Sequence, residues 1–253
     1  MALIQMNYSS KALARKTNLT ILLPELEEQY DSDKPVKYKV LYLLHGLFDD
    51  HLGWLRYTSI ENYIRGTNLA VVMPNVEHGF YTDMEFGPDY YTFVSSELPT
   101  YLSHVFPFYN DKENVFIAGN SMGGYGALKC AIKNKDKYGK VAVLSPVLDI
   151  NDFVHNYPFE GFHPEYVFGK DLNVKNTEND LYFLLKQIES KESLPKMWIH
   201  CGKEDFLYDQ YKKFINFAKE NFISLSFGTY EGDNTWKYWE TQVHSLIEWI
   251  LHE

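Results

Sequence analysis

The sequence GNSMG at residues 119–123 is the feature that most constrains the fold of this 253-residue chain. It follows the apolar run Val115–Ala118 and opens residues 121–135, where alanine, leucine, methionine and lysine predict a helix. Side chains at positions 119 and 123 would collide across a sharp strand-to-helix turn, so both must be glycine. Such a turn exposes the serine hydroxyl, and the helix N-terminus beneath it favours developing negative charge. We therefore expect Ser121 to be a nucleophile rather than part of an ordinary glycine-rich turn.

Short β-rich runs alternate along the chain with stretches long enough for crossover helices. Several runs are apolar without alternation, which suits strands buried on both faces. The expected strands are Leu19–Leu23, Lys39–Leu44, Leu69–Met73, Val115–Ala118, Val141–Leu144, Met197–Cys201 and Leu225–Tyr230. Residues 238–251 carry an apolar stripe at helical spacing. The chain is therefore predicted to be an α/β protein with a mostly parallel central sheet and helices on both faces.

The segment between Val147 and Pro195 interrupts this alternation, because it contains no convincing strand and is rich in aromatic residues, asparagine and aspartate. A long insertion in a compact domain is usually a lid or a binding loop. We expect residues 1–253 to form one domain, with residues 147–195 as a partly helical cap over the carboxyl edge of the sheet. Open α/β sheets bind their ligands at that edge.

Composition excludes several classes of function. Apolar residues make up 45% and charged residues 23%, which is ordinary globular usage, and the net charge of −10 supplies no basic surface for nucleic acid or an anionic membrane. Cys130 and Cys201 do not form a CxxC motif, so buried packing is expected for both. With no apolar signal segment at the N-terminus, we expect a cytoplasmic protein. No metal-ligand spacing or dinucleotide motif predicts a metal or cofactor.

The other parts of a serine hydrolase site can be sought by their order in the chain. His45-Gly46-Leu47 directly follows an early strand, where one oxyanion donor is found in hydrolases of this architecture, and the second donor is the residue after the nucleophile. We therefore expect the backbone N–H groups of Leu47 and Met122 to form an oxyanion hole. The competing interpretation is that His-Gly simply ends the strand.

An acid and then a base should follow the nucleophile. Asp205 comes directly after the strand Met197–Cys201 and is the expected acid, with Glu204 and Asp209 as alternatives. The base should lie in the loop after the last strand, residues 231–236. That loop contains no histidine, and none occurs between His200 and His244.

Five segments of the chain resemble the tributyrin esterase and esterase D group of α/β-hydrolases, which are relatives of S-formylglutathione hydrolases. They are LYLLHGL (41–47), MPNVEHGFYTD (73–83), VFIAGNSMGGYGALK (115–129), CGKEDFL (201–207) and GDNTWKYW (232–239). The resemblance implies an α/β-hydrolase fold and hydrolysis of small carboxylic esters by a Ser-His-Asp triad without a metal or cofactor. It makes Ser121 the nucleophile and Asp205 the acid, and it is compatible with a homo-oligomer.

The sequence departs from this family at the base. The family pattern G-x-H-x-W-x-Y-W has histidine where this chain has Asn234. An amide cannot accept a proton near neutral pH, so the activity of this sequence should be impaired. Either the asparagine is natural and marks a repurposed member, or it was introduced to trap substrate, or another histidine acts in its place. The candidates for such a replacement are His244, His78 and His45.

Aromatic residues are dense around the expected site. Residues 80–93 and Trp54 follow the early strands, and the insertion adds Phe153, Tyr157, Phe159, Phe162, Tyr166 and Phe168. A flat apolar pocket would accept a short acyl chain or an aromatic acyl group, although the same rings could equally pack the cap onto the sheet. The leading hypothesis is a serine carboxylesterase acting on a small ester. The alternative is a non-catalytic binding or interaction protein that keeps the scaffold.

Overall fold

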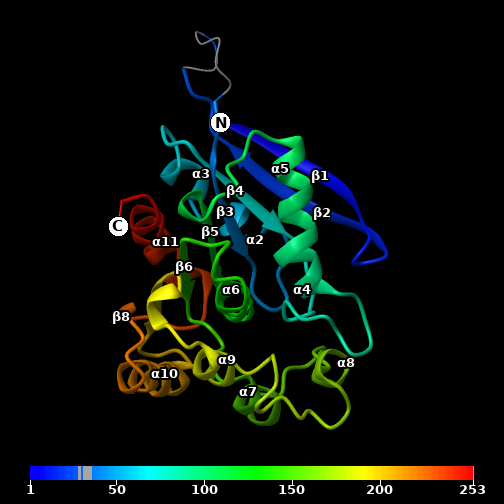
Figure 1. Cartoon of the computed structure of the whole chain (residues 1–253), viewed down its shortest axis with the longest axis vertical. Coiled ribbons are helices and arrows are strands. Elements are labelled where there is room, and N and C mark those ends of the chain that lie inside the picture. The colour runs from blue at the N-terminus through cyan, green and yellow to red at the C-terminus, as the bar shows by residue number, and fades with distance from the viewer. Residues whose placement is uncertain (28–29, 31–35, 253) are drawn as a thin grey trace.

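The computed structural model describes residues 1–27, 30 and 36–252, and its centre is a twisted sheet of eight strands (Figure 1). The strands are β1 (Ala2–Ser10), β2 (Arg15–Leu23), β3 (Lys39–Leu44), β4 (Leu69–Pro74), β5 (Val115–Asn120), β6 (Lys140–Leu144), β7 (Lys196–Gly202) and β8 (Ser226–Tyr230). Their order in the sheet is β1-β2-β4-β3-β5-β6-β7-β8. All seven predicted strands coincide with strands of this sheet.

The sheet is mixed but mostly parallel. Strands β3 to β8 run parallel to one another, whereas β1 pairs antiparallel with β2, and β2 pairs antiparallel with β4. Strand β1 is not among the strands predicted from the sequence. Its residues alternate between exposed and partly buried at the edge of the sheet, and the run ALIQMNYSS has a single β-branched residue, so its local signal is weak.

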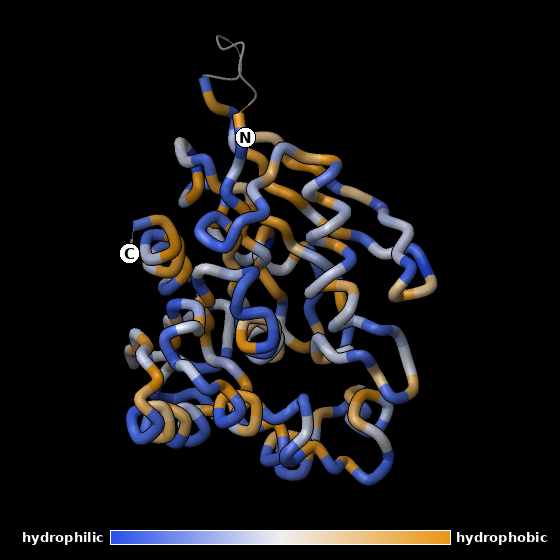
Figure 2. The backbone as a smooth tube through the Cα atoms, in the orientation of Figure 1, coloured by the Kyte–Doolittle hydropathy of each residue, from blue (hydrophilic) through white to orange (hydrophobic). Residues whose placement is uncertain are grey.

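Helices cover both faces of the sheet, as predicted, and each face has its own apolar core. Helices α2 (Gly53–Tyr57), α3 (Ile60–Tyr63) and α11 (Trp236–His252) pack on one face, and α5 (Leu98–Val105), α6 (Met122–Lys133) and α10 (Tyr208–Glu220) pack on the other. Figure 2 shows that hydrophobic residues are concentrated along the strands and hydrophilic residues around the outer loops. Among the described residues, no helix has the length and apolarity needed to cross a membrane. The helices are α2 (Gly53–Tyr57), α3 (Ile60–Tyr63), α4 (Tyr90–Thr92), α5 (Leu98–Val105), α6 (Met122–Lys133), α7 (Ile150–Asn156), α8 (Pro164–Phe168), α9 (Leu181–Gln187), α10 (Tyr208–Glu220) and α11 (Trp236–His252). A π-helical turn, Phe93–Glu97, joins α4 to α5, and 3-10 turns lie at Lys112–Asn114 and Lys191–Ser193.

Residues 147–195 contain the short helices α7, α8 and α9 and no strand. Helices α7, α8 and α9 lie towards one end of the molecule (Figure 1). The segment is tied to α6, because Tyr125 donates a hydrogen bond to the Asn179 carbonyl at 2.8 Å and Lys129 Nζ donates to Asn179 Oδ1 at 2.6 Å. The carboxyl ends of the parallel strands face the same edge of the sheet, so the segments after β3, β5, β6, β7 and β8 meet there.

Candidate active site

Ser121 occupies the strained turn between β5 and α6. Its φ of 50° and ψ of −117° lie in a region of backbone conformation that residues other than glycine rarely adopt. A Cβ at Gly119 would lie 2.5 Å from the carbonyl group of Gly123, and a Cβ at Gly123 would lie 2.3 Å from the Leu44 carbonyl oxygen. The turn therefore requires glycine at both positions, for the steric reason that the sequence suggested.

Backbone hydrogen bonds fix Ser121 from both sides. Its N–H donates to the Leu144 carbonyl at 2.9 Å, and its own carbonyl accepts from the Tyr125 N–H at 3.1 Å. The serine is 8% exposed, at the first turn of α6, where free N–H groups and the helix dipole favour an anion. Met122 is the first residue of α6 and is fully buried.

Leu47 lies in a tight turn beside Ser121. The Asp49 N–H donates to the Gly46 carbonyl at 3.3 Å, and Phe48 has a φ of 68°, as the third position of a type II turn requires. Within the described part of the chain, the Leu47 N–H has no hydrogen-bond partner. A Cβ on Gly46 would lie 3.6 Å from the Ser121 Cβ, so this turn and the serine are in close contact.

Asn234 and Asp205 meet across the carboxyl ends of β7 and β8. Asn234 Nδ2 donates to Asp205 Oδ1 at 3.2 Å and to Oδ2 at 3.1 Å, and it lies 3.4 Å from the Ser145 carbonyl oxygen. The amide thus sits against the carboxylate, as the ring N–H of a triad histidine would.

Asp205 is a buried carboxylate, 5% exposed. Burial raises its pKa, while hydrogen bonds from groups that include the Leu207 N–H at 2.8 Å oppose that rise. The two alternative acids lie elsewhere. Glu204 accepts the Gly232 N–H at 2.5 Å, and Asp209 pairs with Lys212 at 2.7 Å on the surface. Of the three carboxylates, Asp205 is the one that Asn234 contacts.

None of the three candidate replacement histidines is hydrogen-bonded to Ser121. Both ring nitrogens of His45 are occupied, Nδ1 by the Gly46 carbonyl at 2.8 Å and Nε2 by the Val76 N–H at 3.1 Å, and burial lowers its pKa to about 4. His244 lies on the exposed face of α11, 3.6 Å from Glu248. The exposed ring of His78 packs edge-on against Phe48, with 5.0 Å between ring centroids.

Most of the predicted site residues line one small cavity, with a volume of about 200 Å³. It is lined by Gly46, Leu47, Phe48, Ser121, Met122, Phe153, Phe159, Phe206, Asn234 and Trp239. Four of the five predicted site residues line it, and Asp205 lies behind Asn234. Phe48, Phe206 and Trp239 were not predicted as pocket residues. For Phe48 and Phe206, their places next to Leu47 and Asp205 in the sequence were the available signal.

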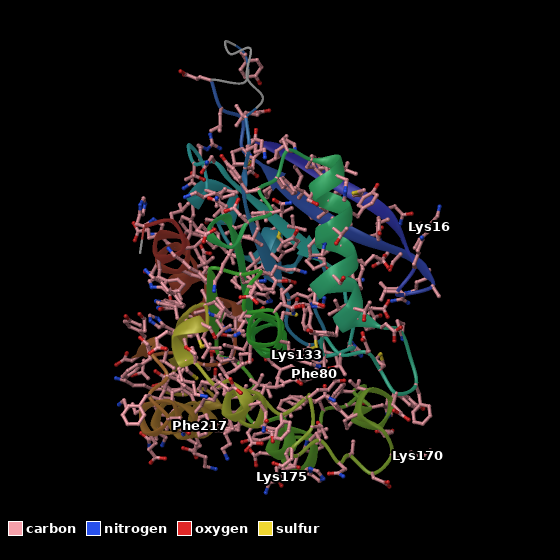
Figure 3. All side chains as sticks on the ribbon, viewed as in Figure 1. Lys16, Phe80, Lys133, Lys170, Lys175 and Phe217 are labelled. Atoms are coloured by element: carbon pink, nitrogen blue, oxygen red, sulfur yellow. The ribbon has the colours of Figure 1, made fainter. Side chains whose placement is uncertain are left out.

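Most of the aromatic residues expected near the pocket pack against one another instead of lining it. Phe80, labelled in Figure 3, is fully buried, and its ring contacts the rings of Tyr125, Phe153, Phe162 and Phe168. Trp54 is also buried, and its indole N–H donates to the Leu44 carbonyl at 3.0 Å. Of the rings singled out in the sequence, Phe153 and Phe159 line the cavity. Most of the other rings pack residues 80–93 and 147–195 against the rest of the domain.

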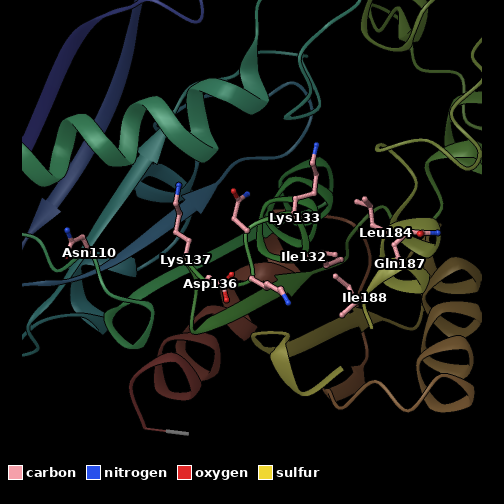
Figure 4. Close-up of a pocket in the computed structure, with 10 residues that line it drawn as sticks. Asn110, Ile132, Lys133, Asp136, Lys137, Leu184, Gln187 and Ile188 are labelled. Atoms are coloured by element: carbon pink, nitrogen blue, oxygen red, sulfur yellow. The ribbon is translucent and has the colours of Figure 1, made fainter. Parts of the chain in front are cut away.

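A second cavity of about 610 Å³ lies away from Ser121, between the C-terminal end of α6 and α9 (Figure 4). Lys133, Lys135 and Lys137 line it, and their ammonium groups contact the Glu178 carboxylate, Ser193 Oγ and the Ser95 carbonyl, respectively. Across the described residues, no group of three histidine, cysteine or acidic side chains is placed to bind a metal ion.

Comparison with known proteins defines the class. The chain has the α/β-hydrolase fold of serine hydrolases and belongs to the esterase family described as "Putative esterase", which matches residues 10–249. It is 31% identical over 265 residues to an acetyl esterase of Caldicellulosiruptor saccharolyticus, covering 99% of this chain and 98% of that protein.

Two solved structures from Staphylococcus aureus are similar over nearly the whole chain. The fluorophosphonate-binding serine hydrolase FphF, with substrate bound, has a TM-score of 0.94 and 37% identity, covering 100% of this chain and 99% of that one. The S-formylglutathione hydrolase FrmB has a TM-score of 0.91 and 38% identity, covering 99% of both chains. These relatives place the chain in an esterase D-like family, as the sequence motifs indicated.

Proposed function

We propose that the chain is a serine carboxylesterase whose catalytic base has been replaced by Asn234. Ser121 Oγ attacks the ester carbonyl, and the N–H groups of Leu47 and Met122 bind the oxyanion of the tetrahedral intermediate. Asp205 holds residue 234 in place. Because Asn234 cannot accept the Ser121 proton, water takes it up, and the departing alkoxide takes a proton from water to leave as the alcohol. A further water then releases the acid from the acyl-serine.

The contact between Asn234 and Asp205 carries this proposal. It places residue 234 against a buried carboxylate and in the wall of the cavity that contains Ser121. The amide reproduces one hydrogen bond of a triad histidine, but it cannot take the serine proton. Loss of the base costs on the order of 10⁶ in turnover and leaves about 10³–10⁴ over water from the oxyanion hole and substrate binding. This chain should therefore acylate very slowly.

The cavity favours a small acyl group. Its volume of about 200 Å³ lies below the roughly 300–1,000 Å³ of sites for drug-sized ligands. Phe153, Phe159 and Met122 give it apolar walls, which suit a short alkyl chain or one aromatic ring. We propose that residues 147–195 act as a cap within a single domain, because this segment supplies two of those walls.

Hydrolysis of p-nitrophenyl butyrate by the native chain, Asn234→His and Ser121→Ala tests the proposal. We expect Asn234→His to gain several orders of magnitude, and Ser121→Ala to be inactive. A native chain that is already active through Ser121, and gains nothing from Asn234→His, would show that another base operates and that residue 234 is misassigned.

A binding protein on the same scaffold is the second candidate, and the asparagine itself favours it. If the native chain and Asn234→His are both inert towards butyryl, octanoyl and feruloyl esters, the esterase proposal fails. Saturable binding of an ester that is not hydrolysed, measured by calorimetry, would then support the binding function.

A further inference from the structure

Asp49 connects the turn that carries Leu47 to the segment that carries Asn234. Its backbone N–H closes the turn onto the Gly46 carbonyl at 3.3 Å. Its side-chain Oδ2 accepts a hydrogen bond from the indole N–H of Trp236 at 3.1 Å. Trp236 is the first residue of α11 and follows Asn234 by two positions. This hydrogen bond thus joins two segments of the chain, through residues that are 187 positions apart in the sequence.

Aromatic rings surround the indole of this hydrogen bond. The Trp236 ring is packed among the rings of Trp54, Tyr57 and Trp239, with centroid distances of 5.0, 5.2 and 5.0 Å. Asp49 is half-buried, and burial raises its pKa to about 6. Because the carboxylate is partly desolvated, its hydrogen bond with the indole N–H stabilises the contact more than a fully exposed pair would.

Gly53 allows the carboxylate and the indole to approach each other. A Cβ at this position would lie 3.0 Å from Trp236 Cζ2 and 3.2 Å from Asp49 Oδ1. The start of α2 therefore leaves the space in which the contact forms.

We propose that Asp49 is a positioning residue, which sets the distance between the oxyanion donor Leu47 N–H and residue 234 through its hydrogen bond to Trp236. This role rests on the proposed function, since it matters only if these groups act on one substrate. A misplacement of about 1 Å between reacting groups costs roughly 10²-fold in rate. Asp49 touches no reacting atom and acts through the two loops that it joins.

The structural half of the proposal is tested in the native sequence, without any activity. Nuclear magnetic resonance reports the Leu47 backbone amide and the Asn234 side-chain amide separately. We expect Asp49→Ala to shift both signals, and Asp49→Asn, whose amide oxygen still accepts the indole proton, to leave both near their native positions. An Asp49→Ala spectrum in which Asn234 does not move overturns the proposal, whatever the chain catalyses.

The catalytic half is tested in the Asn234→His background. We expect Asp49→Ala to lower kcat about 10- to 100-fold with KM nearly unchanged, because transition-state contacts are lost and ground-state binding is kept. Asp49→Asn should restore kcat to within about threefold. Trp236→Phe should match Asp49→Ala, and the double variant should lose no more than either single variant, since both break the same contact.

The neighbouring Asp50 supplies the control, because it is exposed and, among the described residues, its carboxylate accepts one hydrogen bond, from the nearby Leu52 N–H at 2.7 Å. Asp50→Ala should leave kcat within about twofold. Equal losses in Asp49→Asn and Asp49→Ala, or losses that appear in KM alone, overturn the positioning role. If the Asn234→His variant is inactive, the proposed esterase function is wrong. The spectra of the native sequence then still test whether Asp49 couples Leu47 to Asn234.

Discussion

Asn234 Nδ2 lies 3.1 Å and 3.2 Å from the two carboxylate oxygens of Asp205, and that carboxylate is almost completely buried. In the proposed esterase, this amide takes the place of an imidazole N–H donor but has no basic nitrogen. The Asn234 amide and the Leu207 N–H both donate to this carboxylate, so its hydrogen bonds do not require a basic nitrogen at position 234. At position 234, a donor N–H group maintains the contact with Asp205, whereas base catalysis would need a basic nitrogen. The contact can therefore persist in a chain that lacks the base.

Asp205→Asn in the Asn234→His background should lower kcat about 10⁴-fold, because an amide no longer holds the imidazole in the required tautomer. Glu204→Gln is the matched control, since this neighbouring acid bonds the Gly232 N–H and is exposed. It should cost less than about threefold. Steady-state kinetics on p-nitrophenyl butyrate measure both variants. A larger loss in Glu204→Gln would transfer the acid role to that residue.

Gly123→Ala should lower the free energy of unfolding by about 3 kcal/mol, because the new methyl group meets backbone atoms of β3 that cannot move aside. Its nearest contact would be the Leu44 carbonyl oxygen at 2.3 Å. Gly87→Ala is the control, since its methyl group would meet the flexible Met84 thioether at 2.7 Å. Urea denaturation should show a loss below about 1 kcal/mol for Gly87→Ala. Comparable losses would contradict the steric account of the turn.

Lys129 should make stability depend on pH above neutrality. Its ammonium is buried, with hydrogen bonds to Thr82 Oγ1 at 2.9 Å and to Asn179 Oδ1 at 2.6 Å. Burial lowers its pKa from 10.5 to about 7. Between these values the unfolded chain holds the proton more tightly than the folded chain does. The contribution of Lys129 to stability therefore rises with pH, by about 1.4 kcal/mol per unit.

Comparison with Lys129→Met isolates this effect from the other titrating groups. The difference in unfolding free energy, native minus variant, should increase between pH 7 and pH 10 and stay level below pH 7. Denaturant unfolding at each pH measures it. A difference that is flat across the alkaline range would mean that Lys129 stays charged in the folded chain.

Phe159→Ala in the Asn234→His background should extend the cavity towards longer acyl chains. The ring lines the cavity and packs against Phe48 and Phe206 without being a fully buried core residue. We expect the octanoyl-to-butyryl ratio of kcat/KM to rise about tenfold, the scale of one or two methylene groups in an apolar pocket. Phe222→Ala, at an 89% exposed ring outside the cavity, should leave the ratio unchanged. An unchanged ratio in Phe159→Ala would place the acyl chain elsewhere.

The predicted strands were correct where the local signal was strong. Strands β3, β4 and β5 are buried on both faces, so continuous apolar runs identify them. Strand β1 was missed because an edge strand is only half-buried and pairs with β2 through backbone atoms, which leave little trace in the residue pattern.

The sequence alone determined that Ser121 stands on a strand-to-helix turn and that position 234 lacks a histidine, because short-range steric rules and residue identity decide both. Only the tertiary structure decided where side chains point. It turns both nitrogens of His45 onto Gly46 and Val76, brings Phe48, Phe206 and Trp239 to the cavity, and sets Asp49 against Trp236. These directions depend on contacts between segments far apart in the chain, whose relative placement is known only after the sheet has formed.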